Sequence, residues 1–194
     1  MRAHSTDAPV ALFDMDGTLF DFDGAMVRDL ERLRAPGEPP ASDTYQRDLP
    51  HLEARRRLIK RQSGWWAALE PIELGLALFR LAGVVGYHRM VLSKAPDPNK
   101  SPSAWTEKAA CCARHLPGTP VTLSDDKGLV HGRVLVDDWP PYVTAWLRNH
   151  PDGLVVCPAQ PWNAGVFEGD RRVVRATEGS MAEVEARMRE AFGG

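Results

Sequence analysis

The chain has 194 residues, which is enough for one domain with a modest insertion. Hydrophobic residues make up 43% of the sequence and charged residues 26%, a composition that excludes a chain disordered throughout. The formal net charge is −2, with 24 basic and 26 acidic residues, so the overall charge favours neither a nucleic acid polymer nor an anionic membrane as a partner.

The first predicted element is a short buried strand at 10–13, which stops at Asp14 and is followed by a turn at Gly17. Helices are then predicted at 22–33, 49–62 and 71–82. This start is typical of a parallel sheet whose first strand is followed by inserted helices.

The interval between the first two predicted strands, 18–87, is too long for a single crossover helix. We therefore expect a small helical cap, residues 20–87, inserted into a core formed by residues 1–19 and 88–194.

The second half of the chain alternates strands and helices. Strands are predicted at 88–92, 121–123, 134–136 and 154–157, and helices at 102–115, 142–148 and 180–191. Ser180 and Glu183 have the spacing of a capping box at the start of the last helix. The order predicts an α/β fold with a three-layer, Rossmann-like, mainly parallel sheet.

The three cysteines, Cys111, Cys112 and Cys157, show neither metal-binding spacing nor a disulfide pattern. We expect reduced thiols, as in a cytoplasmic protein. The most apolar stretch, 74–87, contains Arg80 and is too short to span a bilayer, so no membrane segment is predicted.

Polar residues stand at the ends of three predicted strands. Asp14 and Asp16 follow the first strand, Ser93 ends the second, and the pair Asp137 and Asp138 follows a later one. Any one of these alone could serve a turn or a helix cap. Because ligands bind at the carboxyl ends of parallel strands, the combination predicts one site.

The acidic residues of this site suit phosphoryl transfer. A carboxylate can attack phosphorus to form an aspartyl-phosphate, and a second carboxyl can protonate the leaving oxygen and then deprotonate water. We predict Asp14 as the nucleophile and Asp16 as the general acid/base. Carboxylates gathered in one place repel one another without a cation, so a Mg²⁺ site is predicted. Its expected residues are Asp14, Asp16, Asp137 and Asp138.

Hydrogen-bond donors for the phosphate are expected beside the metal. Ser93 can donate from its hydroxyl, and a lysine is needed to balance the negative charge. Lys100 is the first choice for that lysine, while Lys94 and Lys108 compete with it.

The motif Asp-x-Asp-Gly-Thr-Leu after an apolar strand, a later strand ending in Ser, a lysine, and then Val-Asp-Asp resemble the haloacid dehalogenase superfamily of phosphatases. The resemblance covers residues 10–138. It implies a phosphoric monoester hydrolase, and the second aspartate, Asp16, is typical of the phosphatase branch.

Further segments are similar to the 5'(3')-deoxyribonucleotidase family. They are Asp21-Phe22-Asp23-Gly24, Trp65-Trp66, Ala104-Trp105-Thr106-Glu107-Lys108 and Ser124-Asp125-Asp126-Lys127. This resemblance implies that Mg²⁺ is held by the Asp14 carboxylate, the Asp16 backbone carbonyl and one carboxylate of the pair Asp137-Asp138, with Asp138 slightly favoured. It also implies a lysine near the phosphate at Lys127.

The same resemblance implies a base-binding pocket lined by Phe22, Trp65 and Trp66. The two tryptophans are adjacent and point in different directions, so one of them is expected in the core. In one departure from the family, Pro102 stands where its phosphate-binding lysine is aligned, which leaves the choice among the lysines open.

The expected substrate is a small-molecule phosphate ester, in the first place a (deoxy)nucleoside monophosphate. Two alternatives stay open. One is a phosphatase for a sugar phosphate or another small metabolite, and the other is a non-catalytic module that binds a nucleotide or a partner protein. The sequence does not distinguish a monomer from a homodimer.

Overall fold

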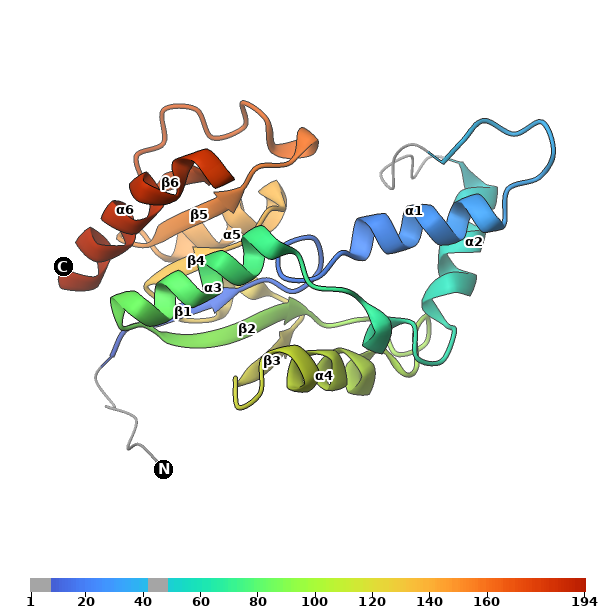
Figure 1. The fold of residues 1–194 in the computed structure, drawn as a ribbon, viewed down its shortest axis with the longest axis horizontal. Helices are drawn as coiled ribbons and strands as arrows, with labels where there is room; N and C mark the ends of the chain where they lie inside the picture. Colours follow the sequence, from blue (N-terminus) through green and yellow to red (C-terminus); the bar gives the residue numbers. More distant parts are fainter. Residues whose placement is uncertain (1–7, 42–48) are drawn as a thin grey trace.

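The structure is a computed structural model that describes residues 8–41 and 49–194. Residues 1–7 of the predicted core and 42–48 of the predicted cap lie outside the described residues. Figure 1 shows a sheet covered by helices, with the helices labelled α1 and α2 extending away from one end of it.

Six parallel strands form the sheet. They are β1 (Val10–Phe13), β2 (His88–Lys94), β3 (Val121–Ser124), β4 (Val134–Val136), β5 (Leu154–Pro158) and β6 (Val173–Ala176). Their order in the sheet is β3-β2-β1-β4-β5-β6, and every neighbouring pair is parallel. The predicted α/β fold with a Rossmann-like parallel sheet is confirmed.

The helices are α1 (Phe22–Arg32), α2 (Pro50–Lys60), α3 (Glu73–Val85), α4 (Ala104–His115), α5 (Pro140–Asn149) and α6 (Met181–Gly193). Side chains of α3, α4 and α6 share a core with Ala11 and Phe13 on one face of the sheet. Helix α5 packs on the other face, against Leu12 and Leu135. Successive β1 residues therefore point into opposite layers, as the pleat of a strand requires.

We refer to α1, α2 and the short 3-10 helix η1 (Trp66–Ala68) as the cap. Helix α3 lies against the sheet instead, where its Phe79 ring is 5.0 Å from that of Phe13. The predicted boundary at residue 87 stays a prediction, and these contacts favour a boundary before α3.

Two local expectations were wrong. Strand β6 was not predicted, because this edge strand is only Val-Val-Arg-Ala and its third residue is exposed. The capping box forms one turn earlier than expected, between Thr177 and Ser180, and Ser180 does not cap α6 with its side chain.

The cysteines and the lengths of the helices bear on two further expectations of the sequence analysis. All three thiols are free and buried. Within residues 8–41 and 49–194, no helix is both long enough and apolar enough to cross a bilayer.

Candidate active site

A sharp turn after β1 brings the loop 14–18 against the end of β4. Gly17 has φ 85°, a conformation that favours glycine, and a Cβ there would lie 3.1 Å from both carboxylate oxygens of Asp138. The Thr18 hydroxyl donates a hydrogen bond to Asp138 Oδ1 at 2.8 Å. Glycine is therefore required for the close approach of the two strand ends.

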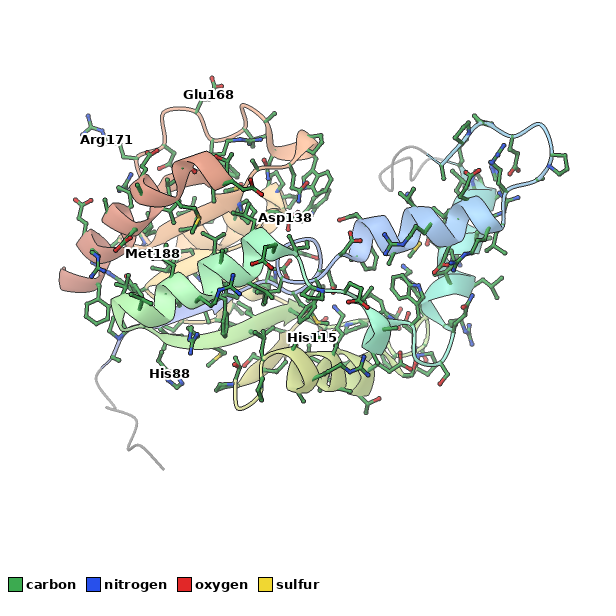
Figure 2. The ribbon with its side chains drawn as sticks, viewed as in Figure 1. His88, His115, Asp138, Glu168, Arg171 and Met188 are labelled. Carbon is green, nitrogen blue, oxygen red and sulfur yellow. The ribbon has the colours of Figure 1, made fainter. Side chains whose placement is uncertain are left out.

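Three predicted metal ligands meet at this edge of the sheet. Asp14, Asp137 and Asp138 are buried, and each offers a carboxylate oxygen within 4.8 Å of the others. Figure 2 shows Asp138 at the end of the sheet that is nearer to the cap. Lys127 lies between two of them, with its Nζ 2.5 Å from Asp14 Oδ1 and 2.5 Å from Asp137 Oδ2.

The electrostatics of this cluster favour a bound cation. Burial raises the pKa of Asp14 well above its usual range, although Lys127 opposes the shift. Burial, followed by repulsion from Asp137, raises the pKa of Asp138 to about 7. One ammonium therefore leaves the three acids under-neutralised, and a divalent cation with oxygen ligands fits this donor set.

Asp16 lies beside this cluster and contacts a different lysine. Lys108 Nζ, from the middle of α4, donates to Asp16 Oδ2 and also to Ser93 Oγ, the latter at 2.8 Å. The other oxygen of Asp16, Oδ1, is buried and has no hydrogen-bond partner among the described residues. Asp16 thus keeps one oxygen free to hold a proton.

The structure separates the lysines into a group that contacts the carboxylates and a group that does not. This grouping differs from the order of preference given by the sequence. Lys108 and Lys127 are each 1% exposed and contact the carboxylates. Lys100, the first choice, pairs with Asp97 at 3.4 Å, and Lys94 pairs with Asp125 at 2.6 Å. Lys94 and Lys100 both line the cavity, but their ion pairs are with Asp125 and Asp97 and not with the carboxylate cluster.

A cavity of about 260 Å³ opens at the carboxylates. Its lining includes Asp14, Asp16 and Asp138 from the sheet edge, Phe22 and Trp66 from the cap, and Tyr142 from α5. The space therefore lies between the predicted catalytic residues and the cap.

The three predicted base-pocket aromatics form one cluster but do not share one surface. The rings of Phe22 and Trp66 stack with centroids 5.4 Å apart, and both line the cavity. Trp65 packs edge-on against both of them and donates from Nε1 to Asp29 Oδ2 at 2.8 Å. Trp65 is thus the tryptophan that faces the interior, and it is not part of the cavity lining.

Two contributors were missed or ranked low from the sequence. Tyr142 lies with its ring centroid 4.7 Å from Lys127 Nζ. Glu107 accepts hydrogen bonds from the backbone N–H groups of Gly64 and Trp66, at 2.8 and 3.1 Å. The segment 104–108 already carried a signal, because it contains both Glu107 and Lys108.

Comparisons with known proteins bear on the fold. No protein-family model and no curated protein sequence matches the chain. The structure is similar to the crystal structure of a HAD family hydrolase from Deinococcus radiodurans R1 with bound phosphate and sodium. That likeness has a TM-score of 0.54 and 16% identity over 95% of this chain and 97% of the other.

A hydrolase from Streptococcus pneumoniae TIGR4 is also similar, with a TM-score of 0.40 and 12% identity over 92% of this chain and 98% of the other. This second likeness is too weak to carry an argument. The first shows that the chain has the Rossmann-like α/β fold of a HAD family hydrolase.

Proposed function

We propose that this protein is a Mg²⁺-dependent phosphomonoesterase that works through an aspartyl-phosphate on Asp14. The observation that carries the proposal is the meeting of Asp14, Asp137 and Asp138 within 4.8 Å at the mouth of a cavity that Asp16 also lines. The similar HAD family hydrolase, which was solved with bound phosphate and sodium, supports it.

Asp14 and Asp138 are the carboxylates best placed to hold Mg²⁺, together with the backbone carbonyl of Asp16. Both carboxylates line the cavity, whereas Asp137 does not. Both Asp137 and Asp138 already accept hydrogen bonds at each carboxylate oxygen, Asp137 from Lys127 and the Trp139 N–H and Asp138 from Thr18 and Trp162. Access to the cavity is therefore what favours Asp138 as the ligand. When bound, the ion would neutralise charge on the transferring phosphoryl oxygens.

Asp14 is the nucleophile in this proposal. Its carboxylate attacks phosphorus, a new P–O bond forms, and the bond from phosphorus to the ester oxygen breaks. Asp16 gives its proton to the leaving oxygen, and the free Oδ1 atom is suited to that transfer. Asp16 then takes a proton from water, which attacks the aspartyl-phosphate and releases phosphate and the Asp14 carboxylate.

The two buried lysines hold this machinery in place. Lys127 fixes Asp14 through a 2.5 Å contact, which orients its carboxylate. Lys108 lines the cavity and joins Asp16 to Ser93, so its ammonium can donate to a bound phosphate. Ser93 is fully buried and is not part of the cavity lining, so its hydroxyl holds Lys108 in place as an acceptor.

For the substrate we propose a (deoxy)nucleoside monophosphate. Phe22 and Trp66 give the cavity the aromatic surface on which a base can stack. The volume of about 260 Å³ is close to the lower end of ligand sites, roughly 300 Å³, so the substrate is small.

A sugar phosphate is the second candidate, and one observation favours it. The Trp66 ring already contacts Phe22, and Lys108 Nζ lies 4.6 Å from its centroid. A tryptophan engaged in this way can serve as a wall rather than as a stacking partner.

Hydrolysis of an aryl phosphate with Mg²⁺ tests the reaction, and a panel of deoxynucleotides and sugar phosphates tests the substrate. Asp14→Asn should lower phosphate release by roughly a thousandfold or more. Asp152→Asn, which changes a residue bordering a separate cavity with Val10 and Arg133, is the matched control and should keep wild-type activity. Equal release by wild type and Asp14→Asn would overturn the proposal.

A further inference from the structure

All the lysines of the chain gather at one place. The sequence contains five lysines, and the rest of its 24 basic residues are arginines. Lys60, Lys94, Lys100 and Lys108 line the cavity, and the fifth, Lys127, contacts Asp14. The same lining contains five aspartates, of which Asp14, Asp16 and Asp138 belong to the proposed metal site and chemistry. Away from those three, the lysines of the lining face only Asp23 and Asp97, so this part of the cavity can attract an anion.

Two of the five already have partners in the proposed chemistry. Lys108 and Lys127 are buried and contact Asp16 and Asp14. The remaining three, Lys60, Lys94 and Lys100, we call the outer lysines. They come from the end of α2, the end of β2 and the loop before α4, so three separate segments contribute lysines to the lining of one cavity.

Two of the outer lysines, Lys94 and Lys100, are accessible to a ligand. The side chains of Lys94 and Lys100 are 39% and 63% exposed. Their ion pairs with Asp125 and Asp97 are therefore partly solvated, and such pairs hold their lysines weakly. A bound anion can compete for both ammonium groups.

Ser101 adds a neutral donor to the same wall. It is only 3% exposed yet lines the cavity, and its hydroxyl makes no hydrogen bond to any described residue. It stands just before α4, whose N-terminal N–H groups favour negative charge. Ser101 therefore adds a hydroxyl donor to the cavity lining that also contains the three outer lysines.

The cavity has more cationic groups than the scissile phosphate alone requires. In the proposed reaction the scissile phosphate uses Lys108 and the metal, both beside the carboxylates that line the cavity. If the substrate carried a carboxylate as its second anionic group, about one lysine would be enough to bind it. A second phosphate, as a dianion, can accept hydrogen bonds from three lysines.

We infer that the substrate is a bisphosphate, whose second phosphate is bound by Lys60, Lys94, Lys100 and Ser101 while the first is cleaved at Asp14. This inference rests on the proposed phosphomonoesterase function and narrows its substrate class.

Two matched substrate pairs test it at constant free Mg²⁺. They are a nucleoside 5'-monophosphate with the 3',5'-bisphosphate, and a hexose 6-phosphate with the 1,6-bisphosphate. In at least one pair, KM for the bisphosphate should be about tenfold lower, and the difference should shrink as salt rises. Lys100→Gln, Lys94→Gln and Ser101→Ala should each remove part of that advantage, whereas Arg148→Gln, an exposed change on α5, should preserve it.

Lysine labelling tests the subsite without catalysis. Because Lys108 and Lys127 are buried, mild reductive methylation should modify only the outer lysines and the terminal amine. Inorganic pyrophosphate should protect the outer lysines at lower concentration than orthophosphate. Unchanged labelling, or equal KM values within both pairs, would overturn the bisphosphate inference. Absence of Mg²⁺-dependent hydrolysis of an aryl phosphate would instead overturn the proposed function.

Discussion

The carboxyl edge of the sheet and the cap wall that faces it are held by different means. At the edge, Asp14 and Asp137 directly follow buried parallel strands whose backbones are fixed by the sheet. In the cap, Trp66 stands on the short helix η1, which Glu107 tethers through two backbone N–H groups. The Trp65 and Trp66 indole N–H groups and the Ala67 carbonyl make further hydrogen bonds, to Asp29, to the Lys60 carbonyl and with Arg114. We infer that the chemistry belongs to a frame set by backbone pairing in the sheet, while the substrate contacts belong to a segment held mainly by side-chain hydrogen bonds.

The largest expected effect is a loss of turnover when the chemistry at the sheet edge is disrupted. Asp16→Asn should lower kcat by roughly 10²–10⁴-fold, because an amide cannot pass the proton. Mg²⁺ affinity should change little, since the proposed ligand from this residue is its backbone carbonyl. Steady-state kinetics and isothermal titration measure the two quantities, and a large loss of Mg²⁺ affinity would contradict the assignment.

A second prediction concerns the stability of the edge. Lys127→Met would leave Asp14 and Asp137 buried without their shared ammonium. The metal-free variant should lose roughly 3 kcal/mol or more of unfolding free energy, and Mg²⁺ should restore part of it. Lys94→Gln, which removes a partly exposed pair, should cost less than about 1 kcal/mol. Urea denaturation of both variants provides the measurement, and equal losses would contradict the role given to Lys127.

The pH dependence of stability sharpens the same point. Burial raises the pKa of Asp138 to about 7 and that of Asp14 in the same direction. An acid whose pKa is higher in the folded than in the unfolded state contributes its full stabilisation below the pKa of the unfolded state, about 3.9. That stabilisation is lost as the pH rises through the pKa of the folded state. The metal-free melting temperature should therefore fall between pH 5 and about pH 8, by on the order of 5 °C.

Mg²⁺ should oppose that fall, so the stabilisation by the ion should grow with pH. Thermal melts of Asp138→Asn should show a flatter pH profile than wild type. A metal-free protein whose melting temperature rises over this range would contradict the buried acidic cluster.

The smallest effect belongs to the cap. Glu107→Ala removes both acceptors that hold Gly64 and Trp66, so the aromatic wall should loosen. We expect KM for the preferred substrate to rise about fivefold with kcat nearly unchanged, an effect equal to about one lost hydrogen bond. Glu107→Gln keeps one amide oxygen as an acceptor and should recover part of the loss. A fall in kcat of the same size would instead place Glu107 in the chemistry through its neighbour Lys108.

The contrast between the regions also explains how far the sequence could predict the site. Asp14, Ser93 and Asp137 were predictable because each stands at the end of an apolar run, and parallel strands end at one edge. The lysine beside Asp16 could be named only as one of several candidates, because the position of the Lys108 ammonium depends on how α4 packs against the sheet edge. Lys100 was preferred for its position just ahead of the helix predicted to begin at Pro102, and such a position says nothing about side-chain direction.

The cap was less predictable for a related reason. Trp65 and Trp66 are neighbours in sequence, and only the tertiary contacts of η1 decide which ring faces the cavity. The edge strand β6 escaped prediction because four residues with an exposed arginine give no clear alternation.

The central claim is that Asp14 carries the phosphoryl group during turnover. Rapid quenching of the enzyme with a phosphate ester and Mg²⁺, followed by borohydride reduction and peptide mass spectrometry, tests it directly, because an acyl phosphate is reduced to an alcohol. The account predicts homoserine at position 14 and unmodified aspartate at position 16. Reduction at Asp16, or turnover without any reducible aspartate, would contradict it.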